Sequence, residues 1–122
     1  MRAFNQLILD TTVTGTVPVC SPTEFDELLG RADELLFEVE VESVSGSSPT
    51  LTLDVYHCNS GKKFVIAPSG TILSAVSISS VPYRDLAKYS SSTLGSLVQL
   101  LVTLGGTTPV ARVRVWACGR TK

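Results

Sequence analysis

Two stretches of the sequence decide the fold: FEVEVESVSGSSPTLTLDVYHC at Phe37–Cys58 and LVQLLVTLGGTTPVARVRVWAC at Leu97–Cys118. They align without a gap, so that Gly46 falls on Gly106. In each copy, apolar residues occupy every second position on either side of a Gly-x-x-Pro cluster. Alternation with a period of two, interrupted by turn-forming residues, is typical of a β-hairpin. The sequence therefore predicts two matched hairpins, each with a strand, a turn and a returning strand.

The outward faces of the two predicted hairpins differ in chemistry. If each hairpin pairs with itself, the first has an acidic outward face that carries Glu38, Glu40, Glu42 and Asp54. The second has an apolar and basic outward face that carries Val98, Leu100, Val102, Arg112, Arg114 and Trp116. A strand that is apolar on both faces is covered on both faces. The cover could be a helix or a loop of this chain, or another protein.

Length and composition favour a single all-β domain over residues 1–122. Hydrophobic residues make up 43% of the 122 residues and charged residues 17%. We predict an antiparallel β-sandwich, jelly-roll-like, of about eight strands. The segment Ser21–Gly30 predicts one short helix, because Ser21 can cap it and Glu24 completes a capping box. Neither a signal peptide nor a membrane-spanning segment is expected.

Residues suited to catalysis or metal binding are scarce. His57 is the only histidine, and the adjacent Cys58 points to the opposite face of a strand, which argues against a Cys–His pair. The glutamates at 38, 40 and 42 have the spacing of paired glycosidase acids, but a solvated strand face explains them equally well. The three cysteines lack metal-site spacing and are expected to be small buried side chains without disulfides. The sequence thus predicts no enzyme, no metal site and no cofactor.

Among binding functions, a protein interface fits the residues best. An apolar stripe beside arginine and tryptophan has the composition found at interface centres. The predicted interface comprises Val98, Leu100, Val102, Arg112, Arg114 and Trp116, with Glu38, Glu40 and Glu42 as the complementary acidic surface. The alternative is that the stripe is covered within this chain and the arginines pair internally. The net charge of −1 argues against nucleic-acid binding, and the single tryptophan is sparse for a carbohydrate platform.

The turn patterns of the first repeat resemble a known family. The run at 36–64, with SVSGSSPTLTL followed by HCNSGKKF, resembles small β-sandwich virion proteins of tailed bacteriophages. The LGGTTP segment at 104–109 is similar to the closing hairpin of that family. Cys58, Ser60 and Phe64 stand where the family pattern usually has Ser, Asp and Trp.

The resemblance implies a structural role on a phage particle. The expected function is that of a non-enzymatic capsid decoration (cement) protein, which binds the major capsid protein and copies of itself as a homo-oligomer. The implied location is the capsid surface of the virion, with the host cytoplasm during assembly, and no nucleic-acid or membrane partner is implied. The alternatives are a tail, neck or fibre-anchor component, or a carbohydrate-binding module with which the particle adheres.

Overall fold

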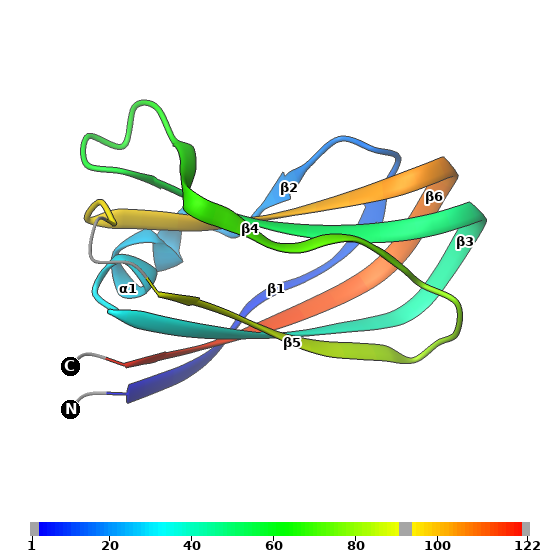
Figure 1. Ribbon diagram of the computed structural model, residues 1–122, viewed down its shortest axis with the longest axis horizontal. Coiled ribbons are helices and arrows are strands. Elements are labelled where there is room, and N and C mark those ends of the chain that lie inside the picture. The colour runs from blue at the N-terminus through cyan, green and yellow to red at the C-terminus, as the bar shows by residue number, and fades with distance from the viewer. Residues whose placement is uncertain (1–2, 91–93, 121–122) are drawn as a thin grey trace.

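The computed structural model describes residues 3–90 and 94–120, which form an antiparallel β-sandwich with one short helix (Figure 1). The elements of this described part, in chain order, are β1 (Ala3–Thr14), β2 (Val19–Cys20), the 3-10 helix η1 (Thr23–Phe25), α1 (Asp26–Gly30), β3 (Glu34–Cys58), β4 (Val65–Ser77), β5 (Tyr83–Ser90) and β6 (Leu97–Arg120). The predicted fold class is confirmed.

Two long strands, β3 and β6, run through both layers of the sandwich. They pair antiparallel along their length, from Glu34 opposite Arg120 to Cys58 opposite Leu97. Layer 1 consists of β1, the C-terminal arm of β6, the N-terminal arm of β3, and β5. Layer 2 consists of β2, the N-terminal arm of β6, the C-terminal arm of β3, and β4. Figure 1 shows both long strands bending at the same end of the molecule, where they pass from one layer to the other.

The prediction that each repeat folds back on itself as a hairpin is wrong. Each copy is one long strand that bends at its Gly-x-x-Pro cluster, and its two arms pair with the arms of the other copy. Glu38 therefore lies opposite Trp116 of the other copy and not opposite a residue of its own repeat. This arrangement gives each arm a hydrogen-bonded neighbour on both sides, which satisfies the backbone donors and acceptors at the centre of both layers.

The two bends are related by an approximate two-fold symmetry. Their residues with positive φ occupy matching positions in the repeat, namely Gly46 (106°), Ser48 (50°), Gly106 (103°) and Thr108 (48°). A Cβ atom on Gly46 would lie 2.8 Å from the carbonyl oxygen of Thr107, and one on Gly106 would lie 2.6 Å from that of Ser47. Both positions therefore need glycine, for the backbone conformation and for the close approach of the other strand.

The inward-facing side chains of the two layers form one hydrophobic core. Fully buried core residues include Phe37, Val39, Val41, Val113 and Val115 from layer 1 and Leu51, Leu53, Val55, Leu100 and Val102 from layer 2. In each arm they occur at every second residue, as a half-buried strand requires. A slip of one residue would expose the whole set, so this core fixes the pairing of β3 with β6.

The helical segment is shorter than the predicted Ser21–Gly30. It comprises η1 and α1 and begins at Thr23. Ser21 does not cap it, because its hydroxyl accepts a hydrogen bond from the backbone N–H of Leu100, and its own N–H donates to the Leu100 carbonyl. Ser21 thus extends the pairing of β2 with β6, and this sheet pairing takes the place of the predicted capping box.

Candidate binding face

The solvent-exposed side of layer 1, here called the outer face, brings together charged and apolar side chains from four strands. Direct cross-strand partners share a face, so the side chains lie in rows across β1, β6, β3 and β5. The charged row is Asp10–Arg114–Glu40–Arg84, the second row is Leu7–Trp116–Glu38–Leu86, and the third row is Asn5–Cys118–Leu36–Lys88. The predicted acidic and basic surfaces are therefore one surface, because β3 pairs with β6.

Arg114 is the centre of an ion-pair network on the outer face. Its guanidinium lies 3.3 Å from a carboxylate oxygen of Glu40, 3.2 Å from one of Glu42 and 3.4 Å from one of Asp10. Arg84 Nε donates to the second Glu40 oxygen at 2.7 Å. At the other end of the network, Arg112 pairs with Asp10. The arginines thus pair within the chain, as the alternative interpretation of the sequence anticipated.

The network shifts the protonation equilibria of two of its members. The hydrogen bond from Arg84, followed by that from Arg114 and the charges of both arginines, lowers the pKa of Glu40 below its ordinary value. The negative charge of Glu42, with further contributions from Glu40 and Asp10, raises the pKa of Arg114. Both shifts favour the ionised forms of Glu40 and Arg114 at neutral pH. The charged row contains two acidic and two basic side chains, whose formal charges cancel.

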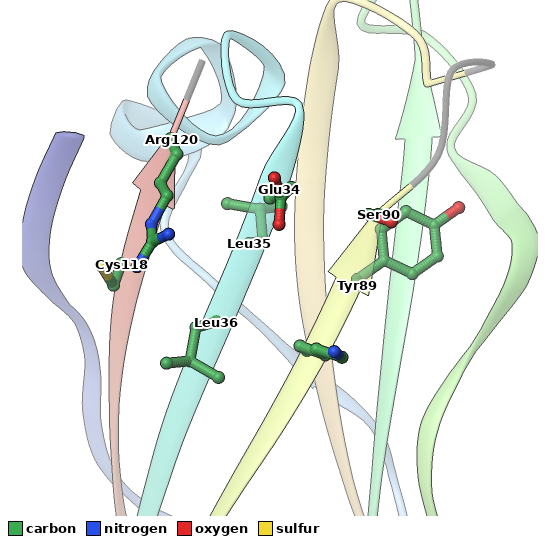
Figure 2. A pocket seen from close by; sticks show the side chains of 8 residues that line it. Glu34, Leu35, Leu36, Tyr89, Ser90, Cys118 and Arg120 are labelled. Carbon is green, nitrogen blue, oxygen red and sulfur yellow. The ribbon is translucent and has the colours of Figure 1, made fainter. Parts of the chain in front are cut away.

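Beside the charged row, the outer face carries an apolar groove. Its exposed side chains are Leu7 (37% exposed), Leu36 (39%) and Leu86 (57%), and the half-buried Trp116 lies between them. A depression of about 330 Å³ is lined by Asn5, Leu36, Glu38, Leu86, Trp116 and Cys118. A second depression, of about 250 Å³, shares Leu36 and Cys118 with the first and extends toward Glu34 and Arg120 (Figure 2). The groove therefore follows the strands from Trp116 to the end of the sandwich opposite the bends.

The predicted apolar stripe does not belong to this face. Val98, Leu100 and Val102 are 0% exposed and point into the core of the same chain, so their predicted placement on an outward face is wrong. The reason is a register shift between Val41 and Ser43, where β3 gains one residue relative to β6. This bulge shifts the inward-pointing positions of the first repeat by one residue, and the second repeat has no matching shift. The two repeats therefore cannot be aligned residue by residue for side-chain direction.

The remaining candidate residues have structural partners. His57 Nδ1 accepts a hydrogen bond from the backbone N–H of Gly95 at 3.0 Å, and Cys58 Sγ accepts one from Gly61. The three cysteines are free, but none is buried as expected: Cys20 is exposed, and Cys58 and Cys118 are half-buried. Within residues 3–90 and 94–120, no group of three or more His, Cys, Asp or Glu side chains is arranged to bind a metal ion. In the same part of the chain, no helix has the length and apolar character needed to cross a membrane.

Several residues of the outer face were not singled out from the sequence. Leu7 and Asp10 lie on β1, and Arg84 and Leu86 lie on β5, the two strands that flank the long central pair. The alternation YRDLAKY at 83–89 was the available signal, because it places Arg84, Leu86 and Lys88 on one face of a strand. Which central strand they flank depends on long-range pairing, which local alternation does not specify.

Comparisons with known proteins agree on the fold. No protein-family model matches the sequence, and no curated protein matches it significantly. Among solved structures, a chain in the structure of the infectious bursal disease virus Gx strain is similar, with a TM-score of 0.62 and 8% identity, over 98% of this chain and 32% of the viral chain.

Two carbohydrate-binding proteins are also similar to this chain. One is the Clostridium thermocellum endo-1,4-β-D-xylanase 10B, in its CBM22-1–GH10 modules complexed with xylohexaose, with a TM-score of 0.60 and 12% identity, over 98% of this chain and 25% of the xylanase chain. The other is the CBM22-1 xylan-binding domain of Paenibacillus barcinonensis Xyn10C, with a TM-score of 0.57 and 11% identity, over 93% of this chain and 80% of that domain. This chain thus spans about a third of the length of the viral chain and a quarter of the length of the xylanase chain. At these identities the similarity establishes the β-sandwich fold alone.

Proposed function

We propose that the chain is a non-enzymatic structural protein of a bacteriophage particle, in which it decorates the capsid and contacts neighbouring subunits through the outer face. The observation that carries the proposal is the combination on one sheet face of an apolar groove around Trp116 and a row of paired charges. Tryptophan and arginine are enriched at interface centres. The exposed leucines beside them add apolar area whose burial supplies affinity.

Two further observations support a role in a virus particle. The turn patterns at 36–64 and 104–109 resemble those of small phage virion proteins. Nearly the whole chain also superimposes on part of a chain from a virus structure. A domain of this size that clamps capsid subunits needs a stable scaffold and a contact face, and the sandwich with its outer face meets both requirements.

Electron microscopy of purified particles tests this proposal. We expect density for the sandwich at many equivalent positions over the capsid, and we expect that adding the chain to particles stripped of it restores their resistance to heat. Density confined to the tail, the neck or a fibre base would show the alternative virion component. The absence of the chain from purified particles would overturn the proposal.

Carbohydrate binding is the second candidate function, and a specific observation favours it. Trp116 lies in a depression whose polar lining includes Asn5 and Glu38, an arrangement in which an indole can contact a sugar ring and the amide and carboxylate can bind its hydroxyls. The fold is shared with a xylan-binding domain. Because Trp116 is the only tryptophan, its fluorescence reports on this depression directly. Saturable quenching by xylo-oligosaccharides, lost in Asn5→Ala, would support this function, and unchanged fluorescence would remove it.

A further inference from the structure

We propose that the occupant of the outer face is a second copy of this chain, related to the first by a two-fold axis that runs parallel to the strands between β3 and β6. The inference rests on the proposed function, because both take the outer face as the contact surface. It adds the identity of the partner and the geometry of the contact, which follow from the order of the side chains across the four strands.

The charged row is complementary to itself about such an axis. Reading across the strands, its charges alternate as Asp10, Arg114, Glu40 and Arg84. A two-fold axis between β3 and β6 exchanges the outer strands with each other and the inner strands with each other. Asp10 then faces the partner's Arg84, and Arg114 faces the partner's Glu40. Every charge of the row meets its opposite, and each contact occurs twice in the dimer.

The second and third rows are compatible with the same operation. Leu7 and Leu86 lie at opposite ends of the second row, so that each faces the other in the partner. Cys118 faces the partner's Leu36, and the indole of Trp116 faces the Glu38 carboxylate of the partner, which can accept its N–H. The contact thus combines leucine pairs at the two edges with a neutral set of charges at the centre.

The charge pattern also argues against a two-fold axis that lies in this face and crosses the charged row perpendicular to the strands. An axis perpendicular to the strands would place β6 over the partner's β6 and β3 over the partner's β3. If this axis crosses the charged row, Arg114 faces the partner's Arg114 and Glu40 faces the partner's Glu40, which is repulsive at both central strands. The axis parallel to the strands instead joins unlike charges along the whole charged row.

The outer face is large enough for a specific contact. It is four strands wide and extends along the eight residues of β5, which corresponds to roughly 19 Å by 27 Å. Each copy would cover about 500 Å², or about 1,000 Å² in total, which reaches the lower limit for a specific interface. The ion pairs are already formed within each copy, so docking needs no new charge to be neutralised.

Sedimentation velocity of the full chain over a concentration series tests whether the partner is a second copy. We expect a reversible dimer. Leu86→Asp should weaken it at least about 100-fold, because the leucine is lost twice and each buried leucine contributes about tenfold or more. Ile66→Asp is the matched control, since Ile66 is 47% exposed on β4 of layer 2 and should leave the dimer intact. A wild-type monomer at every concentration, or equal loss in both variants, would overturn the inference.

Cross-linking tests the axis. In a background with Cys20, Cys58 and Cys118 replaced by serine, Leu7→Cys and Leu86→Cys are prepared as two separate proteins. They are treated with a bis-maleimide whose reach matches the roughly 10 Å between facing sheets. We expect covalent dimers only when the two proteins are mixed. Dimers formed by each protein alone, with no gain on mixing, would show the perpendicular axis and overturn the proposed geometry.

Failure of this inference and failure of the proposed function are distinguishable. A chain that dimerises through Leu86 but is absent from particles retains the inferred contact and loses the decoration role. A chain that is monomeric in solution but occupies particles, with Leu86→Asp as well bound as Ile66→Asp, retains the role and loses the contact.

Discussion

Glu40 on β3 and Arg114 on β6 are direct cross-strand partners, and their side chains pair at 3.3 Å in the middle of the outer face. They come from the two repeats, which at sequence level suggest two separate surfaces of opposite charge. Their pairing shows that the two repeats lie side by side in one sheet. Their opposite charges therefore pair within the chain.

Reversing the charge of Arg114 should destabilise the fold. Arg114→Glu places a fourth carboxylate among Asp10, Glu40 and Glu42, so we expect a lower Tm, with a larger decrease at low ionic strength because salt screens the repulsion. Arg31→Glu is the matched control, since Arg31 forms an exposed pair with Glu27 and should change the Tm little. Equal Tm changes in the two variants at every salt concentration would contradict the network.

Glu40 should contribute to the loss of stability in acid. Its pKa is lowered in the folded state, so its contribution to the free energy of unfolding is complete above the ordinary pKa of 4.5 and is lost as the pH falls through the lowered value. Urea unfolding at a series of pH values should show a steeper loss of stability below pH 4.5 for the wild type than for Glu40→Gln. Parallel curves for the two proteins would contradict this assignment.

Asp26 should have the opposite pH dependence. It is buried at the start of α1, with Oδ2 accepting a hydrogen bond from Gln99 at 3.3 Å and Oδ1 lacking a partner among the described residues. Burial raises its pKa, although the Gln99 hydrogen bond acts in the other direction. The folded state therefore loses stability as the pH rises from the ordinary pKa of 3.8 through the raised value.

The substitution Asp26→Asn tests this expectation. The variant removes the buried charge, so its Tm should exceed that of the wild type at neutral pH, and the difference should vanish in acid. Glu24→Gln, on the exposed side of η1, is the control and should show no such difference. A lower Tm for Asp26→Asn at neutral pH would contradict the expected cost of the ionised carboxylate.

Alanine at Gly106, in a bend, and at Gly15, in the β1–β2 link, should separate backbone strain from close packing. Gly15→Ala introduces only the strain of a positive φ, about 1–2 kcal/mol, because a Cβ there meets nothing within 4 Å. Gly106→Ala also has the strain of a positive φ, and it adds a clash with the carbonyl oxygens of Ser47 and Ser48, which costs about 1–3 kcal/mol more. Urea unfolding should therefore rank Gly106→Ala as the more destabilising. Equal effects would show that the bends do not pack against each other.

The burial of the stripe is measurable in the same way. Leu100 is 0% exposed, so Leu100→Ala should reduce the free energy of unfolding by about 2–5 kcal/mol. Leu86 is 57% exposed, so Leu86→Ala should change the stability of the monomer by no more than about 0.5 kcal/mol. A negligible effect of Leu100→Ala would place the stripe on the surface after all.

The sequence predicted what depends on local alternation. The glycines at 46 and 106, most of the core and the strand segments apart from β5 followed from period-two patterning and turn chemistry, because these are properties of neighbouring residues. The residues of β5 were expected to be part of a long connection at Val81–Ser92. The pairing of the arms did not follow, since alternation defines the two faces of a strand but not the strand beside it. The inward direction of Val98, Leu100 and Val102 was mispredicted for a related reason, because the bulge at Glu42 cannot be recognised in an alignment of the repeats.

The passage of β3 and β6 through both layers constrains how this fold can be altered. Neither layer can be excised, duplicated or exchanged as a separate building block, because each shares its two central strands with the other. We expect insertions to be tolerated at connections outside the long strands, such as the β1–β2 and β4–β5 links, where the chain crosses between layers without contributing to the central pairing. We therefore expect relatives of this chain to differ in what they bind through changes in those connections and substitutions on the sheet faces. The bent pair of β3 and β6 should be retained.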